Sequence, residues 1–290
     1  MNKFLPLLLL ILLHPNRSNG QNFPALSFQK FYDNLGAESA VRLVRSHDNQ
    51  LIIGGNTVMK DSLRANCGNV WIIKADTLGE LIWEQEITVS GCEEMRDMVL
   101  TEDGGILFIG VTSGMIPHRE RGGEAYWGDV MVGKLDSVGR LEWIDSYGGS
   151  KLDQGFAISQ ASFGEHLVVG ASHSNDGAVK QNHGMSDVWT LKLGKQGELK
   201  MSEVVGGSKN DWATCVSVCQ NGDYLIAGQT NSRELDQPDL SLYGNGLIMR
   251  MTQGGFLVWK RSFTCPYGGH LTDIREAADG RIFVAGYKGT

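Results

Sequence analysis

Apolar and polar positions follow one pattern that returns several times along the chain. Residues 70–83, VWIIKADTLGELIW, form an apolar run, a polar turn with Asp76 and Gly79, and a second run in which Leu81 and Trp83 lie two positions apart. This pattern predicts a strand, a tight turn and a second strand. The same pattern recurs at residues 130–143, 188–201 and 247–259.

A separate apolar run that ends in glycine precedes each of these segments, and a fifth copy lies near the C-terminus. The final glycines are Gly55, Gly110, Gly170, Gly228 and Gly286, separated by 55, 60, 58 and 58 residues. A basic residue recurs with similar spacing in the following runs, at Lys74, Lys134, Lys192 and Arg250. Self-similarity with a period of about 58 residues predicts a repeat architecture.

One repeat contains four predicted strands, which we call a, b, c and d in chain order. Strand a is short and mixed, strands b and c are apolar at consecutive positions, and strand d alternates apolar with polar residues. Consecutive apolar positions indicate that both faces of b and c are covered, whereas the alternation in d exposes one face to water. A four-stranded sheet packed between two similar sheets has these properties. The sequence therefore predicts an all-β fold, a β-propeller of four-stranded blades.

The repeats give the boundaries of the blades. They cover roughly residues 37–87, 88–147, 148–205, 206–263 and a partial fifth repeat, 264–290, which has only strands a and b. Residues 28–32 (FQKFY) align with residues 143–147 (WIDSY), and this alignment predicts one additional strand d in the N-terminal region. Two arrangements fit four blades and a partial fifth. One is a five-bladed ring with one defective blade, and the other is a truncated chain whose open arc exposes the apolar face of a terminal sheet.

The first twenty residues predict a secretory signal peptide, followed by the propeller domain at residues 21–290. Lys3 precedes a short apolar run, and small and polar residues follow it. The run is too short for a membrane span, and no later stretch is long and apolar enough to be one. We therefore expect a secreted or otherwise extracytoplasmic protein without a membrane span.

The charge balance bears on the partners. The chain has a net charge of −7. No cluster of Lys and Arg appears, and nucleic-acid binding requires such a cluster because affinity comes from counterion release. We therefore expect no nucleic-acid partner.

Several motifs resemble a repeat that is common in secreted proteins of Bacteroidetes. They are DGGILFIG (103–110), DSVGRLEW (136–143), YGGSKLD (147–153) and SNDGAVKQNHGMSDVWTLKL (174–193). The resemblance covers almost all of the chain after residue 20, about four and a half times over. It implies a surface or exported propeller protein. Many members of this group carry a C-terminal type IX secretion sorting domain, and no such tail is present in this sequence.

The segment ADTLGELIW (75–83) also resembles the tryptophan-docking motif of PQQ-type propellers. The resemblance implies a packing role for Trp83, Trp143 and Trp259, with Phe28 and Met201 in the same position of their repeats. These side chains would fill the spaces between neighbouring outer strands.

Candidate binding residues lie in the long loops between strands b and c, because function concentrates in variable loops on a rigid scaffold. Aromatic side chains beside acidic and amide groups suit stacking on a sugar and hydrogen bonding to it. The alternative is solvated loops that a few aromatic side chains anchor, and it is favoured for any single residue. The candidates are Tyr126, Trp127, Asp176, His183 and Tyr243.

A carboxylate also recurs at the corner between strands d and a, at Glu93, Asp153 and Asp211. One interpretation is a ligand, cation or acid–base site around the mouth of a central channel. The other is structural, in which each carboxylate accepts backbone N–H groups of its own corner. Repetition in successive blades favours the structural interpretation.

If the loops and corners share one face, the five cysteines allow two disulfides, Cys67–Cys92 and Cys215–Cys265. The alternative, which the low cysteine content favours, is small buried apolar side chains with one bridge at most. Their spacing lacks the pairs that a zinc site needs, and the sequence predicts no metal site and no cofactor. No nucleophile-elbow motif is present, and we assign no catalytic residue.

Three functional hypotheses remain open at this stage. The first is an exported, non-enzymatic scaffold that binds a glycan or protein partner through its loop face. The second is an extracellular carbohydrate-active enzyme that uses the corner carboxylates. The third is a truncated fragment of a larger secreted propeller protein.

Overall fold

The computed structural model describes residues 8–18, 21–32, 38–58, 68–89, 91–113, 128–235, 244–264 and 269–288. Over these residues the chain consists of β-strands, turns and one 3₁₀ turn, η1 (Ser162–Gly164). No helix in this part of the chain has the length and apolarity of a membrane span.

Sixteen strands form four antiparallel sheets, each with its four strands in chain order. Each sheet is one blade, and its strands fall within one predicted repeat. Blade 1 contains β3 (Glu38–Arg45), β4 (Leu51–Val58), β5 (Gly68–Ala75) and β6 (Leu81–Ile87). Blade 2 contains β7 (Glu93–Leu100), β8 (Ile106–Thr112), β9 (Asp129–Leu135) and β10 (Leu141–Tyr147). Blade 3 contains β11 (Asp153–Gln160), β12 (His166–Ser172), β13 (Asp187–Leu193) and β14 (Leu199–Val205). Blade 4 contains β15 (Asp211–Val218), β16 (Tyr224–Thr230), β17 (Asn245–Met251) and β18 (Leu257–Phe263).

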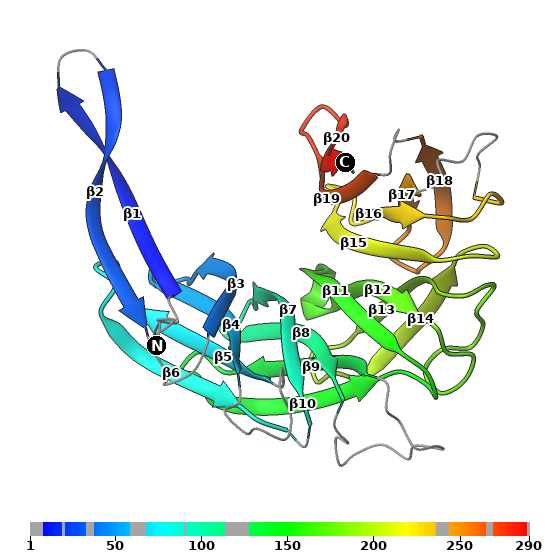
Figure 1. The fold of residues 1–290 in the computed structure, drawn as a ribbon, viewed down its shortest axis with the longest axis horizontal. Coiled ribbons are helices and arrows are strands. Elements are labelled where there is room, and N and C mark those ends of the chain that lie inside the picture. Colours follow the sequence, from blue (N-terminus) through cyan, green and yellow to red (C-terminus); the bar gives the residue numbers. More distant parts are fainter. Residues whose placement is uncertain are drawn as a thin grey trace, which may run out of the picture.

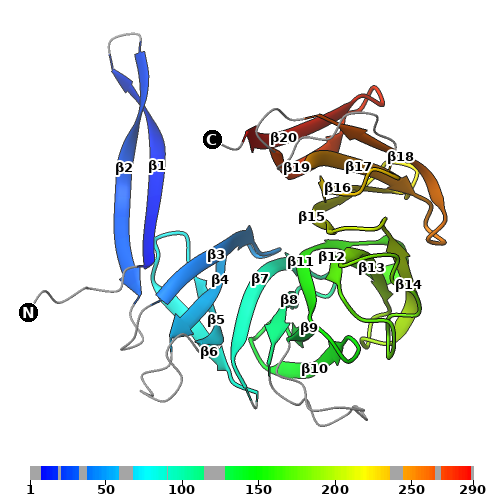
Figure 2. The same ribbon diagram turned by 45° about the vertical axis from the view of Figure 1, so that its right-hand side comes forward.

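Two further strand pairs lie at the ends of the chain. β19 (Gly269–Glu276) and β20 (Ile282–Lys288) form a two-stranded sheet beside blade 4. We call this two-stranded sheet the half-blade. β1 (Leu8–Ser18) and β2 (Gln21–Tyr32) form a separate hairpin beside blade 1. The blades follow one another around a curve that stays open between the N-terminal hairpin and the half-blade (Figures 1 and 2). The fold is thus a β-propeller with the open arrangement that was one of the two predicted.

The core is divided among the spaces between neighbouring blades. Strands b and c are the central strands of each sheet, and every residue of β12 and β16 is buried. Their side chains form one apolar cluster between each pair of adjacent blades. This burial on both faces is why strands b and c read as continuous apolar runs.

Each strand a carries a β-bulge opposite the glycine that ends the apolar part of strand b. In blade 3 the register shifts between Gly155 and Ala157, where strand a faces Gly170. A Cβ at Gly170 would collide with the carbonyl oxygen of Gln154, and a Cβ at Gly55, Gly110 or Gly228 would meet the equivalent carbonyl. The predicted structural glycines therefore permit a close approach of two backbones.

The tryptophans of strand d contact the next blade, as predicted. The ring of Trp83 lies against Gly139 in the turn between strands c and d of blade 2, and Trp143 lies against Gly197 in the same turn of blade 3. Met201 meets Gly255 of blade 4 in the same way. Trp259 packs in the cluster between blade 4 and the half-blade.

The end of β2 occupies the position of a strand d that precedes blade 1. The Tyr32 hydroxyl donates a hydrogen bond to the carbonyl of Gly79, 2.8 Å away. The Tyr147 hydroxyl, at the end of strand d in blade 2, donates to the carbonyl of Gly197 in blade 3. The two contacts are equivalent, so the alignment of residues 28–32 with residues 143–147 is confirmed at this position.

β1 overlaps the predicted signal peptide. It pairs with β2 in the register of a c–d pair. In the hairpin, Leu12 faces Phe28 and, after a bulge, Leu13 faces Leu26. In blade 2, Lys134 faces Trp143 and, after a bulge, Leu135 faces Leu141. Signal cleavage between residues 18 and 21 would remove β1 and keep β2.

The open arc exposes apolar side chains that are buried elsewhere. Leu43 of β3 is 51% exposed, whereas its equivalents Met98, Ile158 and Val216 are at most 6% exposed, because each of these faces a preceding blade. Such a face is expected to favour association.

Candidate functional site

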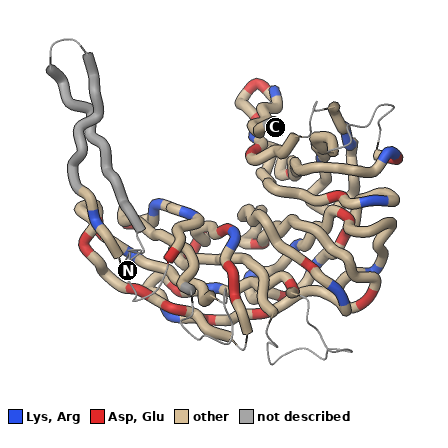
Figure 3. Tube along the Cα trace, viewed as in Figure 1, with Lys and Arg blue, Asp and Glu red and all other residues tan. Residues whose placement is uncertain are grey.

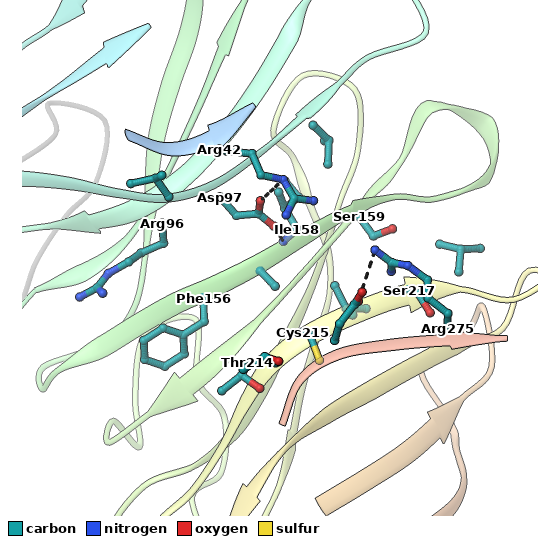
Figure 4. Close-up of a pocket in the computed structure, with 17 residues that line it drawn as sticks. Arg42, Arg96, Asp97, Phe156, Ile158, Ser159, Thr214, Cys215, Ser217 and Arg275 are labelled. Atoms are coloured by element: carbon teal, nitrogen blue, oxygen red, sulfur yellow. Dashed lines mark hydrogen bonds and ion pairs between the residues drawn. The ribbon is translucent and has the colours of Figure 1, made fainter. Parts of the chain in front are cut away.

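A cleft of about 660 Å³ lies where the strands a of the four blades and the half-blade converge, and we call it the axial cleft (Figure 4). Each sheet contributes residues at or beside the bulge of its strand a. The side chains most relevant to binding are Arg42 of β3, Arg96 and Asp97 of β7, Phe156 of β11, Thr214 of β15 and Arg275 of β19. A β-bulge redirects side chains and often lies next to a functional site, so the repeated bulge explains why these residues meet.

One ion pair joins two blades inside the axial cleft. Arg42 Nε lies 3.2 Å from Asp97 Oδ1, and the arginine side chain is 47% exposed whereas the aspartate side chain is 11% exposed. The other carboxylate oxygen of Asp97 accepts the backbone N–H of Ile158 in blade 3, at 3.1 Å. Burial raises the pKa of Asp97, while this hydrogen bond and the Arg42 charge act in the opposite direction. Asp97 therefore holds three sheets together, and Arg42 keeps part of its guanidinium open to solvent.

Two further arginines line the same cleft. The guanidinium of Arg96 lies over the ring of Phe156, 5.9 Å from its centroid, and Nη2 is 2.9 Å from the Glu94 carboxylate. Arg275 Nη2 lies 3.3 Å from Asp273 Oδ1, and both side chains are more than half exposed. An exposed guanidinium can accept an additional carboxylate in a bidentate arrangement, and an aromatic ring beside it offers a stacking surface.

The cysteine beside this cleft is not a reactive group. Cys215 is free and 6% exposed, and burial raises the pKa of its thiol to about 11. The thiol is thus protonated at neutral pH and packs as a small apolar side chain. The predicted Cys215–Cys265 disulfide is wrong, because Cys215 lies in the cluster between blade 4 and the half-blade and has no disulfide partner.

Cys92 is disulfide-bonded. Its partner is outside the residues that the structure describes, where Cys67 and Cys265 both lie. The Cys67–Cys92 pairing remains a prediction.

The corner carboxylates are buried inside their own corners. Glu93, Asp153 and Asp211 are 1%, 0% and 0% exposed, and each is the first residue of a strand a, which starts earlier than predicted. Asp153 accepts the N–H of Gly149 at 2.7 Å and the hydroxyls of Ser172 and Ser174 at 2.5 and 2.8 Å. This is the structural role that repetition favoured.

Asp211 shows the same arrangement. It accepts the N–H of Gly207 at 2.8 Å and the hydroxyls of Thr230 and Ser232 at 2.5 and 2.7 Å. Glu93 accepts the N–H of Gly91 at 3.2 Å and the hydroxyl of Thr112 at 3.4 Å. Burial raises the pKa of Glu93 and of Asp153. The three carboxylates bind their own turns and do not form an accessible ring.

Asp176 and His183, the two predicted loop residues that the structure describes, also contact neighbouring turns. Asp176 Oδ1 accepts the N–H of Ser150 at 2.7 Å, which joins the loop of blade 3 to the corner before it. His183 Nδ1 lies 3.1 Å from Asp187 Oδ2, and the histidine side chain is 40% exposed. Burial raises the pKa of Asp187, while hydrogen bonds from His183 oppose that shift. The other predicted loop residues, Tyr126, Trp127 and Tyr243, lie outside the described residues.

Sequence reasoning missed the arginines and Phe156 of the axial cleft. A signal was present, because Arg42 lies in the predicted strand a of the first repeat, and Arg96 and Asp97 come just before the predicted strand a of the second. Charged groups at such positions are expensive to bury and therefore indicate a solvent-filled or ligand-filled interior. Among the described residues no group of three or more His, Cys, Asp or Glu side chains is arranged to hold a metal ion.

Comparison with known proteins adds no assignment. No protein-family profile and no curated protein sequence matches the chain. Among solved structures, the chain is similar to a protein named as a candidate gluconolactonase, with 13% identity, a TM-score of 0.43, and coverage of 93% of this chain and 80% of the other. It is also similar to a luciferin-regenerating enzyme, with 8% identity, a TM-score of 0.42, and coverage of 87% and 70%. A glycosyl hydrolase from Bacteroides ovatus has 10% identity, a TM-score of 0.37, and coverage of 87% and 85%.

Proposed function

We propose that the protein is an exported, non-enzymatic binding module that holds a glycan in its axial cleft. The observation that carries the proposal is that Arg42, Arg96, Arg275 and Phe156 line one cleft, with Arg96 over the ring of Phe156. Guanidinium groups bind carboxylates in a bidentate manner, and an aromatic ring stacks on a sugar face. We therefore propose a glycan with carboxylate-bearing sugars as the ligand class.

The charge distribution supports this choice. Acidic and basic residues are interspersed along the described chain (Figure 3), whereas the cleft combines three arginines with two aspartates, Asp97 and Asp273. Each of these arginines has a carboxylate within ion-pair distance, Asp97, Glu94 or Asp273, and the exposed part of each guanidinium group remains available to an anionic ligand.

The enzymatic alternative, as predicted, uses the corner carboxylates as its acid–base pair. The proposal of corner-carboxylate catalysis requires two carboxyl groups that face a bound sugar. Glu93, Asp153 and Asp211 are buried and accept hydrogen bonds from their own corners. Export, by contrast, rests on the predicted signal peptide alone.

The test measures binding of oligogalacturonides and of uncharged malto-oligosaccharides by isothermal titration calorimetry. We expect the acidic oligosaccharide to bind, Arg96→Gln to weaken binding about tenfold through loss of a charge-assisted contact, and added salt to weaken it further. Arg140→Gln is the matched control, because Arg140 lies in an exposed turn of blade 2.

Two results would overturn the proposal. Equal affinity for neutral and acidic oligosaccharides, with no effect of Arg96→Gln, would reject the axial cleft as an acidic-glycan site. Release of shortened products during the titration, detected by chromatography, would reject a non-enzymatic role.

A further inference from the structure

A second pocket, of about 450 Å³, lies between the outer strands of blades 3 and 4, and we call it the junction pocket. β14 contributes Glu203, Val204 and Val205, and the turn before β18 contributes Gly255 and Phe256. Among the described residues, none lines both this pocket and the axial cleft. The junction pocket is therefore a separate feature, and it lies between two four-stranded blades.

A tyrosine makes the corresponding contact between blades 2 and 3. Tyr147, the seventh residue of β10, is 2% exposed and donates its hydroxyl to the carbonyl of Gly197 in the turn between strands c and d of blade 3. Tyr32 at the end of β2 makes the same contact with Gly79 of blade 1, at 2.8 Å. In both places a phenol ring reaches from the end of one strand to the next turn, and its hydroxyl binds a turn carbonyl.

Blade 3 has a small residue at this position. Val205 is the seventh residue of β14 and faces Val188, as Tyr147 faces Val130 in blade 2. The tryptophan of strand d is also replaced here, by Met201. A valine side chain is too short to reach the next turn and has no hydroxyl group to donate. The junction between blades 3 and 4 therefore lacks the phenol ring of the junction before it.

The two ends of the missing contact both border the junction pocket. Val205 lines it from blade 3 and Gly255 from blade 4. Gly255 lies two residues before its strand d, as Gly197 does, and both have a left-handed backbone, with φ of 86° and 82°. Met251 and Phe256 add apolar wall. An apolar pocket that ends at a turn carbonyl has the shape and the acceptor that a phenol ring needs.

Two opposite charges border the same pocket. Glu203 comes from blade 3 and Lys260 from blade 4. Within the described residues neither side chain forms an ion pair, so both are available to a ligand. A third polar group, His183, is already held by Asp187, with Nδ1 3.1 Å from Oδ2. A ligand with an ammonium and a carboxylate group complements Glu203 and Lys260 together.

We propose that the junction pocket binds a free amino acid with a 4-hydroxyphenyl ring, such as L-tyrosine. The ring lies between Val205 and Phe256, and its hydroxyl donates to the carbonyl of Gly255. The ammonium group pairs with Glu203 and the carboxylate with Lys260. This site is independent of the glycan proposal.

The test measures binding of L-tyrosine to the purified protein by isothermal titration calorimetry, and we expect one site per chain. L-Phenylalanine lacks the hydroxyl group and should bind about fivefold more weakly. Glu203→Gln and Lys260→Gln should each weaken L-tyrosine binding about fivefold through loss of a charge-assisted contact. Neither substitution should change the binding of p-cresol, which has the ring and the hydroxyl but no charge.

Val205→Tyr fills the junction pocket with a ring of the chain itself, as Tyr147 does one blade earlier. We expect this variant to lose L-tyrosine binding and to melt at a higher temperature than the parent protein, so unfolding does not explain the loss. Val138→Tyr is the matched control, because Val138 is 56% exposed and lies in the turn between strands c and d of blade 2. The control should bind L-tyrosine as the parent protein does.

Three outcomes would overturn the proposal. The first is no binding of L-tyrosine at about 1 mM, which is already weak for a specific site. The second is unchanged binding by a folded Val205→Tyr variant. The third is equal affinity for N-acetyl-L-tyrosinamide, which has no charged groups. That result would assign the junction pocket to a tyrosine side chain of a partner polypeptide and reject a free amino acid as the ligand.

Discussion

At the scale of single residues, most of the distinctive side chains of this protein act between blades. Trp83 and Trp143 each fill a space against a glycine of the following blade. Tyr32 and Tyr147 each donate a hydrogen bond to the turn between strands c and d of the following blade. Asp97 binds an arginine of one neighbour and a backbone N–H of the other. A residue of this kind stabilises the stacking of blades more than the sheet to which it belongs.

Replacing Trp143 with alanine tests this role. Loss of the indole opens a cavity against Gly197, and we expect the free energy of unfolding to fall by about 2–4 kcal/mol, with a lower melting temperature. Thermal unfolding by circular dichroism measures the change. Phe256→Ala is the control, because Phe256 is 76% exposed. A Trp143→Ala protein that melts like the parent protein would contradict the packing role.

At the scale of the elements, the bulge of strand a and the glycine of strand b form one unit. The bulge brings a backbone carbonyl close to the neighbouring strand, and only glycine leaves room for it. The same bulge directs Arg42, Arg96 and Phe156 into the axial cleft. The glycine that ends the apolar run of strand b therefore also supports the geometry of the axial cleft.

Gly170→Ala tests the close approach. The added methyl group collides with the carbonyl of Gln154, and the two strands must separate to relieve the collision. We expect a loss of about 1–3 kcal/mol in the free energy of unfolding, measured by urea titration. Gly254→Ala serves as the matched control, because its nearest neighbour would be a Phe256 ring atom at an ordinary 3.4 Å. Equal free energies of unfolding for the two variants would show that strand a moves away from the added methyl group without loss of stability.

At the scale of the whole molecule, the open arc exposes a surface that a preceding blade covers in blades 2 to 4. This surface is the apolar face of β3 around Leu43. It adjoins the opening between the N-terminal hairpin and the half-blade (Figure 1). Such a surface favours association until another element covers it.

Leu43→Lys is expected to reduce self-association. A charge at this position makes burial of the β3 face against a second molecule costly. Sedimentation velocity over a range of protein concentrations measures the effect. The control is Leu78→Lys, at a turn residue of blade 1 that is 66% exposed. If Leu43→Lys associates as strongly as the parent protein, this face does not drive association.

The sequence alone determined the local and repeated features. The strands, their order within a blade, the period, the inter-blade tryptophans and the strand b glycines all follow from hydrophobic patterning, which repeats because each blade has the same neighbours. The structural interpretation of Asp153 and Asp211 was also available, since repetition itself indicated it.

Only the tertiary structure decided where the repeats converge. The axial cleft takes two to five residues from each strand a, and these differ from repeat to repeat, so no single repeat reveals the site. Whether Cys215 meets another cysteine likewise depends on how blade 4 packs against the half-blade. The physical reason is the same in both cases. Patterning reports whether a residue is buried, whereas the curvature of the arc decides which distant residues are brought together.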